Sequence, residues 1–134
     1  MRVLCDTSFL MVLVSKPIKN VGRVESQLGR LDFLVPDIVI GELERLRGKA
    51  GPKRSTLAKT AIDLTRVKFK VVPVAHAQHV DDSIMEYAAR EKCAVATIDT
   101  NLRRRLIANE ILVLTLNQDK LIVANPKPKP RDQT

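Results

Sequence analysis

The sequence predicts an α/β domain with a mostly parallel central sheet flanked by helices, because apolar runs of strand length alternate with amphipathic segments of helix length. The runs are rich in Val, Ile and Leu, whereas the segments between them carry apolar residues at spacings of three and four. A chain of 134 residues suits one domain whose core needs no disulfide or structural metal.

In the first half of the chain, helix breakers and caps separate the expected elements. Lys16-Pro17 ends a first helix, and Pro36-Asp37 opens a third that ends near Gly48. The basic stretch 48–55 contains Gly and Pro, so we expect a mobile loop there. The expected strands are 1–5 and 33–35, and the expected helices are 9–14, 21–31, 37–48 and 56–67.

In the second half, Asp81 and Asp82 lie in the first turn of an expected helix, where carboxylates interact favourably with the helix dipole. The expected helices are 80–91 and 101–108, and the expected strands are 69–74, 94–98, 111–116 and 121–124. From Asn125 onward Pro alternates with Lys or Arg. We therefore expect a domain over 1–124 and a flexible, extended basic tail over 125–134.

The charge of the chain points to a polyanionic partner. Lys and Arg number 23 against 15 Asp and Glu, a formal net charge of +8, and nucleic acid is the commonest partner for such a surplus. An excess that only aids solubility is the alternative. Aromatic residues make up 3% of the chain, so base stacking is not expected to be the main means of holding a nucleic acid.

The compartment expected from the sequence is the cytoplasm. Cys5 and Cys93 lie far apart in apolar surroundings without a CxxC motif, which favours two buried thiols, although a single bridge between them stays open. The sequence has no secretory leader and no apolar run of membrane-spanning length. Glycine-rich nucleotide-binding patterns are also missing, and His76 and His79 lack the companions of a zinc site.

Four acidic residues have settings that are unusual for surface carboxylates. Asp6 and Asp99 each follow an apolar strand, Glu42 lies in an apolar helical stretch, and Asp81 begins a helix. Ligands of parallel sheets bind beyond the carboxyl ends of the strands, so these side chains could meet at one edge. Clustered carboxylates repel one another, and Mg²⁺ or Mn²⁺, which prefer oxygen ligands, offset that repulsion.

Each of these acids also has a purely structural interpretation. Asp81 and Asp82 could be ordinary first-turn charges, and Asp99 could simply cap the helix that follows it. The spacing of the residues alone leaves the two interpretations open.

Four short blocks, taken in order, resemble the PIN-domain family of nucleases. No single block is specific, but the ordered set is, and it covers about residues 1–124. The blocks are Asp6-Thr7-Ser8-Phe9-Leu10, Pro36 with Glu42-Leu43, Asp81 with Ile84 and Ala88, and Thr97 with Asp99 and Asn101.

The resemblance implies a three-layer Rossmann-like fold and RNA cleavage that depends on Mg²⁺ or Mn²⁺. It implies that the metal is held by Asp6, Glu42, Asp81 and Asp99. Thr7 or Ser8 would orient Asp6, and Asp82 would assist or replace Asp81. Asn101 stands where many members have a further Asp, which puts a second metal ion in doubt because the amide is a poorer ligand.

The resemblance leaves three roles open. Archaeal and eukaryotic endonucleases that process small-subunit ribosomal RNA fit, and so do the toxins of toxin–antitoxin pairs, which would bind an antitoxin. The third role is a non-catalytic RNA-binding scaffold. The block around Asp81 and the Arg103-Arg104-Arg105 run favour the processing branch, and the valine-rich, aromatic-poor composition suits an archaeal source. The family resemblance also suggests a homodimer.

Basic residues near the acidic blocks are candidates for contacts with the RNA backbone, which position RNA but carry little sequence information. A solvated helix face is the alternative for any of them. The candidates are Arg45, Arg47, Lys49, Lys53, Arg54, Arg103, Arg104 and Arg105.

Overall fold

A computed structural model describes residues 1–126 of the chain. One six-stranded sheet has the order β3-β2-β1-β4-β5-β6. The first five strands are parallel, and β6 pairs antiparallel with β5. The strands are β1 (Arg2–Cys5), β2 (Asp32–Pro36), β3 (Lys70–Val72), β4 (Ala94–Ala96), β5 (Val113–Asn117) and β6 (Lys120–Val123). The predicted α/β class is confirmed.

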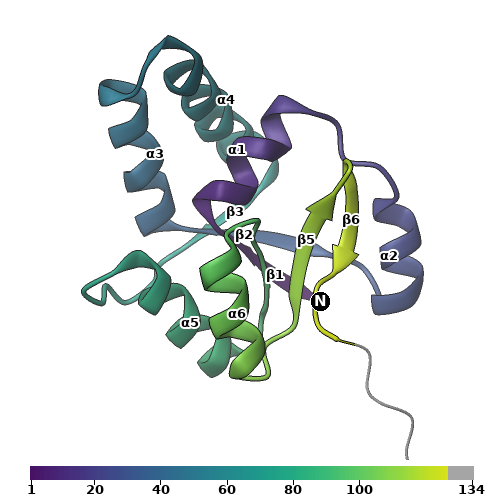
Figure 1. Ribbon diagram of the computed structural model, residues 1–134. Coiled ribbons are helices and arrows are strands. Elements are labelled where there is room, and N and C mark those ends of the chain that lie inside the picture. Colours follow the sequence, from purple (N-terminus) through teal and green to yellow (C-terminus); the bar gives the residue numbers. More distant parts are fainter. Residues whose placement is uncertain (127–134) are drawn as a thin grey trace, which may run out of the picture.

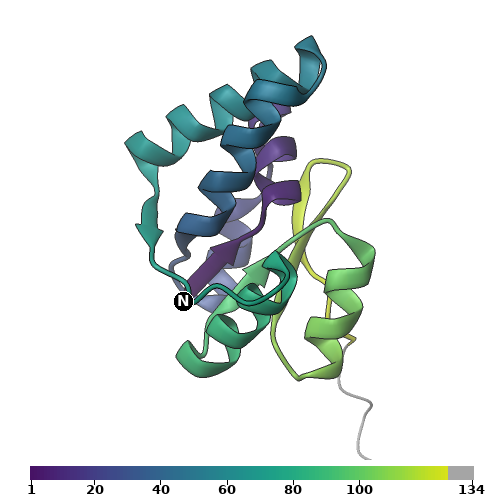
Figure 2. The same ribbon diagram turned by 90° about the vertical axis from the view of Figure 1, so that its left-hand side faces the viewer.

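Helices flank the sheet in separate groups, as the two perpendicular ribbon views show (Figures 1 and 2). α1, α3 and α4 pack on one another on one side, α5 and α6 lie on the other, and α2 contacts β6. This is the three-layer arrangement that right-handed crossovers between parallel strands produce. The helices are α1 (Thr7–Ser15), α2 (Val21–Leu28), α3 (Asp37–Lys49), α4 (Pro52–Lys68), α5 (Val80–Glu91) and α6 (Thr100–Ala108).

The expectation of a mobile loop over 48–55 is wrong. α3 continues to Lys49 and α4 begins at Pro52, so only Ala50 and Gly51 connect them. Proline has no amide hydrogen and a fixed φ, which suits the first helical position, so this Gly-Pro pair starts a helix. The Ser55 hydroxyl also donates to the Arg47 carbonyl at 2.5 Å, which ties the two helices together. The basic residues of this segment are therefore held on helices.

Two other boundaries differ for local reasons. α2 ends at Leu28 instead of residue 31, because Gly29 adopts a φ of 88°, which interrupts the helix. β4 ends at Ala96 instead of residue 98. Thr97 and Ile98 thus follow the last residue of β4 and lead from this strand toward α6.

The core consists of aliphatic residues from both faces of the sheet, including Val3, Leu4, Val35 and Val95, each fully buried. Cys5 and Cys93 are free and buried, as expected. Asn125 anchors the start of the predicted tail, because its side chain accepts from the Val113 amide and donates to the Ile111 carbonyl. The rest of that prediction, residues 127–134, lies outside the described residues. No helix in the described part of the chain is long and apolar enough to cross a membrane.

Candidate active site

The candidate site lies where the strand order of the sheet reverses. The chain moves from β1 through β2 to β3 on one side, then returns to place β4 on the other side of β1. Such a switch point opens a crevice beyond the carboxyl ends of the two adjacent strands. Cys5 and Ala96 are paired at these ends, and the Asp6 amide donates to the Ala96 carbonyl at 3.1 Å. Asp6 therefore begins the crevice.

Asp6 is almost buried, with 5% of its surface exposed. Its carboxylate accepts from the Ser8 hydroxyl at 2.8 and 3.0 Å and from the Phe9 amide at 2.8 Å. The last bond caps α1. Burial raises the pKa of Asp6 to about 6, although these hydrogen bonds act in the opposite direction. The fold thus holds this carboxyl rigidly in a place where its charged form is costly.

Thr97 joins two of the predicted acids. Its buried hydroxyl donates to Asp6 Oδ2 at 2.5 Å and accepts from the Asp99 amide at 3.0 Å. Ser8 completes the arrangement, because its hydroxyl accepts from the Ile98 amide at 3.2 Å. These contacts fix the turn after β4 against the start of α1, so Asp6 and Asp99 are placed by one hydrogen-bond network.

Glu42 reaches the same edge from α3. The Thr7 hydroxyl donates to Glu42 Oε1 at 2.5 Å, which links the first residue of α1 to the middle of α3. Thr7 therefore orients Glu42 while Ser8 orients Asp6. From the sequence we expected either Thr7 or Ser8 to orient Asp6. In the structure Ser8 contacts Asp6, whereas Thr7 contacts Glu42. The functional role of these two hydroxyls stays a prediction.

Asp81 and Asp99 complete the group. Asp99 is exposed and caps α6 by accepting from the Leu102 amide at 3.0 Å, and Asp81 lies in the first turn of α5. Burial raises the pKa of Asp81, and the negative charges of Asp99 and Glu42 raise it further. Asp81 in turn contributes to the raised pKa of Asp6. The four acids predicted from the sequence thus share one edge and repel one another.

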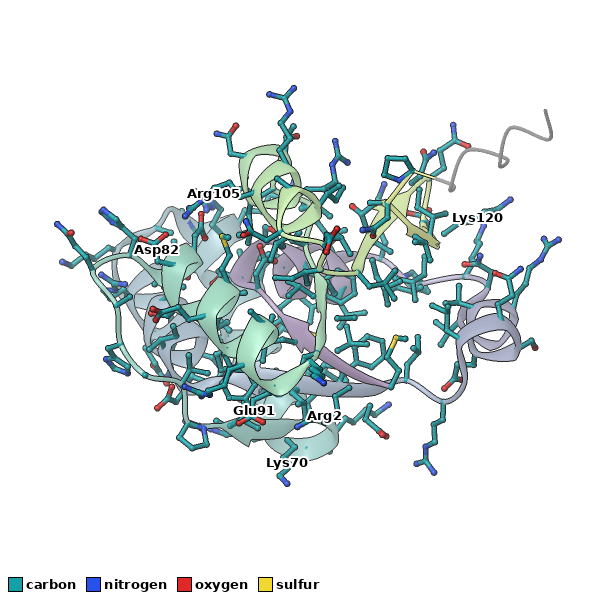
Figure 3. All side chains as sticks on the ribbon, turned by 90° about the horizontal axis from the view of Figure 1, so that it is seen from below. Arg2, Lys70, Asp82, Glu91, Arg105 and Lys120 are labelled. Carbon is teal, nitrogen blue, oxygen red and sulfur yellow. The ribbon has the colours of Figure 1, made fainter. Side chains whose placement is uncertain are left out.

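Asp82 faces a different partner from Asp81. Its Oδ1 lies 2.5 Å from Arg105 Nη2, and Figure 3 shows the two side chains pointing toward one another from α5 and α6. The hydrogen bond from Arg105 holds the pKa of Asp82 below its usual value. Nothing in the spacing of the two residues indicated this pair, because they are distant in the sequence.

The donor set fits a hard divalent cation. All four acids supply oxygen, and a cation would relieve the repulsion that raises the pKa of Asp81. Within residues 1–126 no three Asp, Glu, His or Cys side chains converge closely enough to hold an ion by themselves. Mg²⁺ commonly takes only one or two carboxylates and keeps several waters, so carboxylates spaced around an edge suit it.

Basic residues surround the edge unevenly. Arg45, Lys49 and Arg54 line, with Thr7, Glu42 and Leu46, a basic hollow of about 500 Å³ beside the acids. Arg47 lies 3.7 Å from Glu44 and Arg105 is paired with Asp82, so both have acidic partners. Lys53 is exposed in the first turn of α4, and α6 carries Asn101, Arg103 and Arg104.

Comparison with known proteins shows the family to which the chain belongs. Residues 3–119 match the PIN like domain family. The chain is 28% identical over 122 residues to ribonuclease VapC4 of Methanocaldococcus jannaschii, an alignment that covers 89% of this chain and 92% of the relative.

Two solved structures resemble the fold. The PIN domain endonuclease Utp24 aligns with a TM-score of 0.74 at 25% identity, over 93% of this chain and 92% of that one. VapBC2 from Rickettsia felis, solved with a DNA fragment from its promoter, aligns with a TM-score of 0.64 at 13% identity, over 87% of this chain and 100% of that one. The chain belongs to the PIN-like domain family of nucleases.

Proposed function

We propose that the protein is a divalent-metal-dependent endoribonuclease that hydrolyses RNA phosphodiester bonds. The observation that carries the proposal is the setting of Asp6, which is held nearly buried by Ser8, Phe9 and Thr97 at an edge it shares with three other acids. The similarity to ribonuclease VapC4 supports RNA as the substrate, and the similarity to the endonuclease Utp24 supports internal cleavage.

The metal would be Mg²⁺ or Mn²⁺, held by Asp6, Glu42, Asp81 and Asp99. Bound there, it would supply charge stabilisation for the phosphate and a more acidic water. Asp6 acts as a rigid anchor, because its hydrogen bonds leave it no alternative position. Asn101 lies on the exposed first turn of α6 and brings no charge to the edge, which favours a single ion.

The RNA backbone would lie against the basic hollow. Arg45, Lys49 and Arg54 line it together with Glu42, so a phosphate bound there lies next to a metal ligand. These residues are on α3 and α4, whose short connection holds the charges in place. Arg103 and Arg104 extend positive charge along α6 on the opposite flank of Asp99.

Two biological roles fit the proposed activity. Processing of ribosomal RNA is favoured by the block around Asp81 and by the Arg103-Arg104-Arg105 run, which resemble those of the processing endonucleases. A toxin partnered by an antitoxin is the second candidate, favoured by the identity to ribonuclease VapC4. The first role requires a ribosome-assembly partner and the second an antitoxin, and either is compatible with a homodimer in the cytoplasm.

The test is cleavage of end-labelled single-stranded and structured RNA with Mn²⁺, Mg²⁺ or EDTA. Asp6→Asn and Asp99→Asn should both abolish cleavage, and Asn keeps the capping of α1 and α6 in these variants. Asp32→Asn is the matched control, because Asp32 lies at the opposite end of the sheet, 3.7 Å from Arg30. RNA binding without cleavage under any metal would instead support the non-catalytic scaffold.

A further inference from the structure

A second concave site adjoins the acidic edge. It is a cavity of about 340 Å³ between α3, the first turns of α5 and the segment that leads into α5, and we call it the α3–α5 cavity. Clefts that bind small ligands usually measure about 300–1,000 Å³. The cavity is therefore large enough for one ring system and too small for a folded partner.

The cavity lies next to the candidate active site, as its lining residues show. Gly41 lines the cavity and directly precedes Glu42, and Val80 lines it and directly precedes Asp81. Arg45 lines both this cavity and the basic hollow. An RNA strand with a phosphate at Glu42 would therefore have its backbone near Arg45 and a neighbouring nucleotide at the cavity.

The lining suits a planar group with apolar faces and polar edges. Ile38, Gly41, Ala77 and Val80 supply apolar surface. Asp37, His76 and Gln78 supply polar groups, and the exposed His76 imidazole lies 4.0 Å from Asp37 Oδ1. An unstacked nucleobase has this chemistry, and imidazole rings stack on such bases.

The wall of the cavity is formed in advance of any ligand. The Ala77 amide donates to the Ser83 hydroxyl at 2.7 Å, and the Val74 amide donates to Asp37 Oδ1 at 3.1 Å. Ser83 is itself buried in α5. These bonds hold the segment 74–79 against α3 and α5, so a base would enter without first ordering a loop, which favours affinity.

We propose that the α3–α5 cavity binds one unstacked base of the RNA, next to the phosphodiester bond that is cleaved, and so determines a base preference at that position. This inference rests on the proposed function and adds to it a site of specificity, which backbone contacts alone do not provide. It also predicts that the cleaved segment is single-stranded, because a base in a duplex must first be unpaired and unstacked before it can enter a cavity, which costs free energy.

The test fills the cavity from its α3 side. A Cβ added at Gly41 meets no atom within 4 Å, so Gly41→Leu introduces a side chain into open space and improves helix propensity. Gly48→Leu is the matched control, because Gly48 lies in the same helix, also has open space around it, and does not line the cavity. Both variants should fold.

The first measurement is cleavage of four single-stranded RNAs that differ only in the base beside the cleaved bond. The wild type and Gly48→Leu should prefer one base by about tenfold, the effect of one hydrogen bond between the edge of the base and Asp37, His76 or Gln78. Gly41→Leu should cleave all four at similar rates. Equal rates for the four RNAs in the wild type, or an unchanged preference in Gly41→Leu, would overturn the inference while leaving the nuclease function intact.

The second measurement needs no catalysis. Nucleoside monophosphates are titrated into the protein in EDTA while the backbone amide resonances of Ala77 and Gln78 are followed by NMR. Saturable shifts in the wild type that are lost in Gly41→Leu support base binding even if no metal restores cleavage, in which case only the proposed function fails. If these amides do not respond to any of the four nucleotides, the cavity is not a base site.

Discussion

The carboxylates at the candidate site differ from the ion-paired carboxylates elsewhere on the protein in the partners they have. Asp32, Glu44 and Asp82 each lie within 4.0 Å of an arginine nitrogen. Across the described residues, Asp6, Glu42, Asp81 and Asp99 form no such ion pair. Instead, the charge of Asp81 raises the pKa of Asp6, and the charges of Asp99 and Glu42 raise the pKa of Asp81. Carboxylates that the fold gathers without counter-charge cost stability, which is the usual mark of a functional cluster.

The contrast is clearest within α3, because Glu42 is a site carboxylate without an ion pair among the residues that the structure describes and Glu44 is a carboxylate paired with arginine. Glu44 lies 3.7 Å from Arg47 and 3.6 Å from Arg66, whereas Glu42 accepts from Thr7. We expect Glu42→Gln to lower the cleavage rate by about 10³-fold, because it removes a metal ligand that contributes several kcal/mol to the transition state. Glu44→Gln should leave the rate unchanged. Equal rates for the two variants in a single-turnover RNA cleavage assay would contradict the assignment.

A bound divalent cation should offset the loss of stability that repulsion among the four site carboxylates causes. Saturating Mn²⁺ or Mg²⁺, at about 100 times its dissociation constant, should raise the melting temperature of the wild type by about 10 °C, since it binds only the folded protein. Asp99→Asn should lose most of this shift in calorimetry. The control variant Asp32→Asn should keep it, and a full shift in Asp99→Asn would remove that residue from the cation site.

The pH dependence of stability should expose Asp6 directly. A carboxyl whose pKa rises on folding, here from 3.8 to about 6, binds its proton more tightly in the folded state. The contribution of Asp6 to stability in EDTA should therefore be greatest below the unfolded pKa and should fall as pH rises from about 4 to about 6, by at most about 3 kcal/mol.

Urea unfolding of the wild type and of Asp6→Asn across this range isolates the contribution of Asp6, because the other acids are common to both proteins. The difference in unfolding free energy between the two should change in favour of Asp6→Asn as pH rises. A difference that stays constant between pH 4 and pH 7 would mean that the Asp6 carboxyl is not perturbed.

The smallest effect on cleavage is expected from a substitution of Asp82, whose carboxylate is paired with Arg105. Surface ion pairs contribute little, so Asp82→Asn should keep cleavage within about fivefold of the wild type. Asp81→Asn should abolish it in the same assay. If Asp82→Asn were as inactive as Asp81→Asn, Asp82 would have to be counted among the metal ligands.

Much of the fold was predictable because its determinants are local. Apolar runs such as Val3 to Cys5 and Ala94 to Ala96 form strands, and the parallel sheet follows from their alternation with amphipathic helices. The wrong prediction at 48–55 also has a local cause. Gly51-Pro52 is compatible with both a loop and a helix start, and the packing of α4 on α3 selected the second.

The sequence by itself determined which residues are chemically suited to the site, because Asp6 and Asp99 must follow their strands wherever the sheet forms. Only the tertiary structure decided how these residues are used. Thr97 bridging Asp6 and Asp99, Arg105 pairing with Asp82, and the cavity between α3 and α5 all join segments that are distant in the chain. Such contacts depend on how the layers pack against one another, and the sequence pattern of a single segment does not predict that packing.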